Sequence, residues 1–91
     1  MTKYKKQIPI EERERIELKK QIESYKNSLK IAKEIRDKAV ESKCYGNLGI
    51  AYHSLGDFRK AIEFHENSLK IFKEIGDKAG ESKCYGIQLL F

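Results

Sequence analysis

The sequence is poor in residues that interrupt helices and in long apolar runs. It holds a single proline, Pro9, and almost no runs of β-branched residues, which would signal strands. No apolar run approaches the ~20 residues that a membrane-spanning helix needs. The lysines near the N-terminus are not followed by the apolar stretch of a secretory signal. These absences predict a helical, cytoplasmic chain with no membrane partner.

A strong excess of one charge is also missing from most of the chain. The formal net charge is +5, of which residues 1–20 hold +3 (seven Lys/Arg, four Glu) and residues 21–91 hold +2 (twelve Lys/Arg, ten Asp/Glu). Lys and Glu alternate in a way that is typical of solvated helix faces, whereas nucleic-acid binding favours a concentrated basic stripe. We therefore expect no nucleic-acid partner.

The sequence does contain a near-copy of one of its own segments. Residues 27–46 read NSLKIAKEIRDKAVESKCYG, and residues 67–86 read NSLKIFKEIGDKAGESKCYG, with 17 of 20 positions identical. The three differences are Ala32/Phe72, Arg36/Gly76 and Val40/Gly80. A fixed long period indicates a repeat array, whose units stack on each other and present a shared surface to a partner. The duplication therefore favours a binding scaffold over an enzyme.

The apolar spacing within and between the copies is helical. The three stripes are Leu18, Ile22, Tyr25, Leu29 and Ala32; Tyr45, Leu48, Tyr52 and Leu55; and Phe58, Ile62, His65, Leu69 and Phe72. Gly56-Asp57 and Gly76-Asp77 each pair a helix-ending glycine with a helix-starting aspartate. Arg36-Asp37 lacks the glycine, and we expect a tighter or partly helical turn there. The prediction is four helices, over 10–36, 38–54, 57–75 and 78–90, in an all-α antiparallel helix-hairpin repeat.

Several residues are expected to serve packing alone. His65 and the tyrosines Tyr45, Tyr52 and Tyr85 occupy core positions. Gly49 is expected to let a partner helix approach, with Ala61 as the small residue opposite it. Gly46 lies on another face, and it either opens room for a ligand or is simply tolerated.

The two cysteines occupy the same place in each copy. Equivalent sites in stacked helices lie about 9–10 Å apart, whereas a disulfide needs Cα atoms within about 7 Å. Cys44 and Cys84 are therefore expected to be reduced. The two cysteines and two distant histidines are too few for a metal site, and we expect no cofactor.

The run from Tyr45 to Tyr52, followed by Gly56 and Ala61, resembles the tetratricopeptide repeat pattern aromatic-x-x-Leu-Gly-x-x-Tyr … Gly … Ala. The resemblance covers a full repeat over 37–76, flanked by a half repeat over 10–36 and a truncated repeat over 77–91, after a basic N-terminal lead over 1–9. A period of forty is similar to the long-repeat subgroup that includes the Pins/LGN-type adaptors. The resemblance implies a short α-solenoid that acts as an adaptor or scaffold and binds extended peptides.

The resemblance also implies which face binds, because the first helix of each unit lines the concave groove in this family. The candidate groove residues are Lys43, Gly46, Asn47, Ile50, His53, Ser54 and Lys83. The Asn47 amide can donate to and accept from a peptide backbone, and the two lysines together favour an acidic ligand segment. The competing interpretation is that these polar residues simply form a solvated face and that Ile50 packs under a neighbouring helix.

The sequence leaves two functional classes open. The first is a non-catalytic module that binds a peptide or protein segment in the groove. The second is structural: a fragment of a larger tetratricopeptide array, or an element that associates with another copy through the C-terminal helix, where Ile87, Leu89, Leu90 and Phe91 form an apolar end. No nucleophile–base pair, phosphate loop or paired carboxylate set supports an enzyme.

Overall fold

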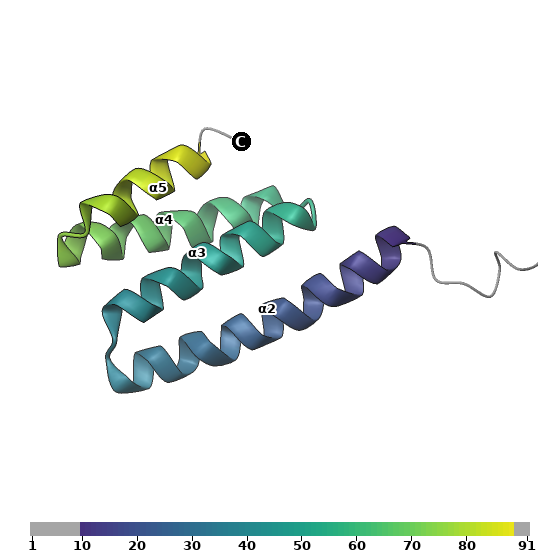
Figure 1. Cartoon of the computed structure of the whole chain (residues 1–91), viewed down its shortest axis with the longest axis horizontal. Coiled ribbons are helices and arrows are strands. Elements are labelled where there is room, and N and C mark those ends of the chain that lie inside the picture. The colour runs from purple at the N-terminus through teal and green to yellow at the C-terminus, as the bar shows by residue number, and fades with distance from the viewer. Residues whose placement is uncertain (1–9, 89–91) are drawn as a thin grey trace, which may run out of the picture.

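Four helices make up the part of the chain that the computed structural model describes, residues 10–88 (Figure 1). They are α2 (Ile10–Ile35), α3 (Lys38–Ser54), α4 (Phe58–Ile75) and α5 (Lys78–Gln88). Helix α2 packs on α3, α3 on α4 and α4 on α5, so α2 and α5 lie at opposite edges of the stack. The fold is the predicted all-α repeat, and the helix bounds match the prediction within one residue, except that the predicted end of the last helix at residue 90 lies outside the described residues. The predicted basic lead over 1–9 lies outside the described residues.

Each inter-helix turn uses the predicted aspartate. Asp37, Asp57 and Asp77 accept hydrogen bonds from the backbone N–H three residues later, at 3.1, 3.2 and 2.9 Å. These bonds satisfy amides that have no partner within the first helical turn. Gly56 and Gly76 take the predicted left-handed conformation, with φ of 83° and 73°.

The turn at Arg36 differs from the expectation. Arg36 has a φ of 60°, in the same left-handed region as Gly76. The following aspartate N–H donates to the Ala32 carbonyl at 2.9 Å, as the Asp77 N–H donates to the Phe72 carbonyl at 2.9 Å. The turn is therefore neither tighter nor helical, because the aspartate cap and the next helix impose the same backbone in both copies.

The core lies between α2, α3 and the first half of α4. Its buried members are Ile22, Leu48, Ala51, Tyr52 and Ala61. Phe64 stacks on Tyr52 with ring centroids 5.4 Å apart and nearly parallel planes. These residues confirm the predicted stripes of α2 and α3.

Part of the α4 stripe and one tyrosine were predicted wrongly. Phe58 and Ile62 are 53 % and 39 % exposed, and Tyr85 is 47 % exposed. Helix α5 has 11 residues against 18 in α4, so its described part is too short to reach the first turns of α4. Tyr85 lies at an edge of the stack, where it packs against the Lys73 ammonium, 5.6 Å from the ring centroid.

The neighbour of Gly49 also differs from the expectation. A Cβ atom on Gly49 would lie 2.7 Å from ring atoms of His65. His65 is fully buried, as predicted, and Ala61 is buried one turn earlier on the same helix. Gly49 therefore makes room for an imidazole ring and not for Ala61.

Candidate functional site

A hollow of about 180 Å³ lies where α3, α4 and α5 meet. Helix α3 supplies the charged, amide and apolar side chains of one wall, α5 supplies Lys83 and Cys84, and α4 forms the base. The lining residues are Lys43, Gly46, Asn47, Ile50, His65, Ser68, Phe72, Lys83 and Cys84. The structure thus brings five of the seven candidate groove residues to one hollow: Lys43, Gly46, Asn47, Ile50 and Lys83.

The other two candidates lie elsewhere. Ser54, at the end of α3, lines a different hollow with α2 residues such as Arg13 and Glu17. His53 is half-buried, and its ring lies 5.2 Å from that of Phe58. Both residues lie beyond the stretch of α3 that the described part of α5 faces.

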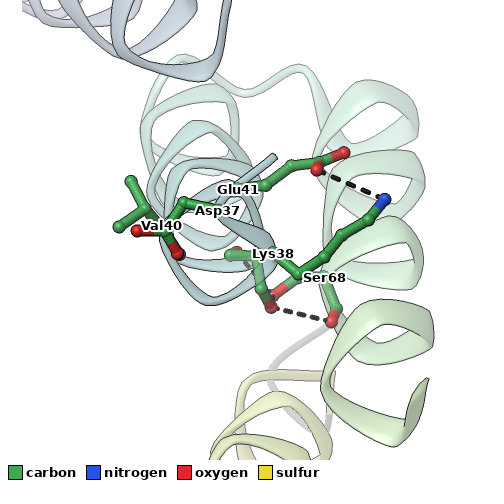
Figure 2. A network of polar contacts seen from close by, with 6 residues as sticks. Asp37, Lys38, Val40, Glu41 and Ser68 are labelled. Atoms are coloured by element: carbon green, nitrogen blue, oxygen red, sulfur yellow. Dashed lines mark hydrogen bonds and ion pairs between the residues drawn. The ribbon is translucent and has the colours of Figure 1, made fainter. Parts of the chain in front are cut away.

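Reciprocal serine hydrogen bonds join α3 to α4 at the base of the hollow, where Ser68 lies. Figure 2 shows Ser68 on α4 among the polar contacts between these two helices. The Ser42 hydroxyl on α3 donates to the Ser68 carbonyl on α4 at 3.0 Å, and the Ser68 hydroxyl donates to the Ser42 carbonyl at 2.9 Å. The Cys84 thiol donates to the Ser68 hydroxyl oxygen at 3.6 Å, which links α5 to the same point. Buried, satisfied polar groups of this kind fix the relative position of packed helices.

The charge around the hollow is positive. Lys43 and Lys83 are exposed and come from equivalent positions of the two copies, and no carboxylate is among the described residues that line the hollow. Burial lowers the pKa of His65, and His53 lowers it further. The His65 imidazole is therefore neutral near pH 7, and the lysines supply the charge.

Sequence reasoning missed four lining residues: His65, Ser68, Phe72 and Cys84. His65 and Phe72 belong to a stripe that was assigned to the core, and both are indeed buried. A buried residue can still form the base of a hollow, and periodicity alone does not separate these roles. The sequence does offer one signal for Ser68. Both Ser42 and Ser68 recur forty residues away, and pairing the two helices as an antiparallel hairpin places them opposite each other.

Gly46 is not required by packing. A Cβ atom there would lie 3.5 Å from the Ser68 hydroxyl oxygen, which is an ordinary contact distance. Gly46 lines the hollow, so its missing side chain leaves space there, in agreement with the first of the two interpretations of this glycine. The contrast with Gly49 shows that the two glycines of α3 have different roles.

The cysteines are free and buried, as predicted. Burial raises the pKa of the Cys44 thiol, and the nearby Glu41 carboxylate raises it further. Among the described residues, no cluster of three or more His, Cys, Asp and Glu side chains could hold a metal ion. None of the helices in residues 10–88 combines the length and apolar character needed to cross a membrane.

The stack of antiparallel helix hairpins and the forty-residue duplication define a helical repeat protein. The tetratricopeptide repeat family model matches residues 20–74, more than half of the chain, and the chain belongs to this family. Proteins of this family are typically non-catalytic, and their repeats generally mediate protein–protein interaction. No curated protein and no solved structure matches the chain.

Proposed function

We propose that the protein binds an extended, acidic segment of a partner protein in the hollow between α3, α4 and α5, and acts as an adaptor or scaffold. The observation that carries the proposal is that Lys43 and Lys83 line the same hollow, one from α3 and one from α5, and that no carboxylate is among its described lining residues. The two lysines provide charge complementarity to an acidic segment, which favours encounter and register.

The remaining lining residues suit a peptide. Asn47 is exposed on the α3 wall, where its amide can bond the peptide backbone in both directions. Ile50 is 45 % exposed and offers an apolar surface for a ligand side chain. His53 and Ser54 extend the same helix beyond the hollow, where a longer segment would pass.

Binding of acidic peptides, followed by isothermal titration calorimetry, tests the proposal. A peptide selected on the wild-type chain should bind Lys43→Glu and Lys83→Glu at least tenfold more weakly, because each change places a carboxylate beside the ligand. Asn47→Ala should weaken binding about fivefold, the effect of one hydrogen bond of about 1 kcal/mol.

Lys26→Glu provides the matched control. Lys26 is exposed on α2 and does not line the hollow, so the same charge change should leave affinity nearly unaltered. If both groove lysine variants bind acidic peptides as tightly as the wild type, the groove proposal is wrong. If Lys26→Glu weakens binding equally, only the net charge of the chain is being measured.

Three further predictions from the sequence remain proposals. These are the long-repeat subgroup of the Pins/LGN-type adaptors, the cytoplasmic location and self-association through the C-terminal helix. The period of forty supports the subgroup, and the two free thiols agree with a reducing compartment. The residues that motivated self-association, Ile87 and 89–91, lie outside the residues whose side chains the structure describes.

A further inference from the structure

The seam between α3 and α4 is made of residues that occur twice in the chain. Besides the Ser42–Ser68 pair, a small hollow follows this seam. Helix α3 contributes Lys38, Glu41 and Tyr45 to it. Helix α4 contributes Asn67, Lys70, Ile71 and Glu74. Each of these residues, and each serine, has an identical residue forty positions away.

The second set of these residues is divided between the two edges of the molecule. Helix α5 repeats the α3 side of the seam, with Ser82 in place of Ser42 and Tyr85 in place of Tyr45. Helix α2 repeats the α4 side, with Ser28 in place of Ser68 and Ile31 in place of Ile71. Figure 1 shows that α5 and α2 form opposite edges of the stack, so the two halves cannot meet within one chain.

Three of the repeated residues, Ser28, Ile31 and Ser82, are exposed where their counterparts are buried, whereas Glu81 is buried like Glu41. Ile31 is 56 % exposed, whereas Ile71 is 6 % exposed. Ser28 and Ser82 are both exposed, whereas Ser68 and Ser42 are fully or almost fully buried. The chain therefore presents both halves of its own interhelical seam to solvent.

We propose that a second copy of the chain covers this surface, with α5 of one copy packed against α2 of the next in the register of the α3·α4 hairpin. Ser82 and Ser28 would exchange the hydrogen bonds that Ser42 and Ser68 make within the chain. Each half carries a cation and a carboxylate: Lys78 forms an ion pair with the buried Glu81 on α5, and Lys30 and Glu34 are exposed on α2, so association brings no excess of like charge together.

The contact is head-to-tail and does not use the same surface twice. Such a heterologous contact leaves one free half at each end, so copies add to open chains and not only to dimers. The match stops in the second half of the seam, where Gln21 and Ser24 stand in place of Ala61 and Phe64. The association is consequently weak, because only the first half of the hairpin interface is reproduced.

The inference does not depend on the peptide-groove proposal. The seam uses the faces of α5 and α2 that carry Ser82 and Ser28, whereas the groove uses Lys43, Asn47 and Lys83. A failure of either proposal therefore leaves the other standing.

Sedimentation velocity of the whole chain over a wide range of concentration tests the inference. The weight-average mass of the wild type should rise with concentration beyond that of a dimer. Ser28→Arg and Ser82→Arg should each remain monomeric, because each blocks one half of the seam at an exposed position that the fold does not need. Circular dichroism should report unchanged helix content for both.

Mixing the two variants gives the decisive result. Each retains the half that the other lacks, so an equimolar mixture should form one-to-one dimers that do not grow further. Glu66→Arg, a change to arginine at an exposed site of α4 that lies off the seam, should associate like the wild type. The inference is overturned if the wild type stays monomeric at all concentrations, if either blocked variant associates alone, or if the mixture stays monomeric while the wild type associates.

Discussion

At the scale of the residue, the three differences between the near-identical copies have structural explanations. Arg36 and Gly76 adopt the same left-handed backbone. The other two differences form a compensating pair at the junction between one unit and the next. The first copy combines a small Ala32 with Val40, and the second combines a large Phe72 with Gly80. A Cβ atom on Gly80 would lie 2.4 Å from the Phe72 ring, so the glycine is required by that ring.

This pairing predicts a strong coupling between the two positions. Gly80→Val should destabilise the chain by about 1–3 kcal/mol through overpacking, and Phe72→Ala should cost about 3–5 kcal/mol through loss of a buried ring. The double variant reproduces the pair of the first copy and should be more stable than the sum of the single changes by about 1–3 kcal/mol. Urea unfolding of the four proteins measures this coupling. Additive costs would show that the rings and side chains at this junction do not compete for space.

A second prediction at this scale concerns pH. Because the pKa of His65 is lowered in the folded state, the unfolded chain takes up this proton first as the pH falls. Stability should therefore decrease as the pH falls through the unfolded pKa of about 6.5, with a slope of at most about 1.4 kcal/mol per pH unit from this group. Above that range this contribution does not change with pH.

Urea midpoints measured between pH 5 and 8 check the slope. His65→Gln should flatten the profile, whereas His53→Gln should keep most of it, because burial is the larger cause of the shift. Nuclear magnetic resonance of the wild-type imidazole gives an independent test if the buried substitution prevents folding. Titration of His65 at or above pH 6.5 would contradict the prediction.

At the scale of the element, aspartate caps and left-handed turns determine where the helices begin and end. These signals are local, and the sequence therefore predicted all four helices and the position of each turn between them. The conformation of Arg36 was not predictable, because the preference of the residue itself is overridden by the flanking helices. The burial of α4 was predicted only in part, since it depends on how far α5 reaches along it. The sequence located five residues of the hollow but not its base on α4, because periodicity does not separate a core residue from a buried residue that also lines a hollow.

The left-handed Arg36 offers a test at this scale. A non-glycine residue in the left-handed region destabilises the folded chain by about 1–2 kcal/mol. Replacing it with glycine removes this cost, but glycine also loses more conformational entropy on folding, which offsets part of the stabilisation. Arg36→Gly should therefore stabilise the chain by about 0.5–1 kcal/mol in thermal or urea unfolding. Arg59→Gly, in the right-handed first turn of α4, is the matched control and should destabilise it. Equal effects of the two changes would argue against the left-handed turn.

At the scale of the whole molecule, burial is concentrated in the centre of the stack. Helices α3 and α4 each have a helix on both sides, whereas α2 and α5 lie at its edges. The core residues come from α2, α3 and α4, and residues 11–17 of α2 are all exposed. Repeat proteins of this kind derive their stability from contacts between neighbouring units, so stability should vary along the stack.

Native-state hydrogen exchange should therefore show a gradient along the chain. Amides in the middle of α3 and α4 should exchange only through global unfolding, because they lie around Leu48 and Ala61, which are fully buried. Amides in the first three turns of α2 should exchange at least about 100-fold faster, since fraying there exposes almost no apolar surface. The exchange should be measured at low protein concentration, where the proposed head-to-tail contact is absent. Raising the concentration should then slow exchange in α5 and the second half of α2, because these helices carry the two halves of the seam. Uniform protection from Glu11 to the end of α4 at low concentration would mean that the helices unfold as one cooperative unit, with the edges as stable as the centre.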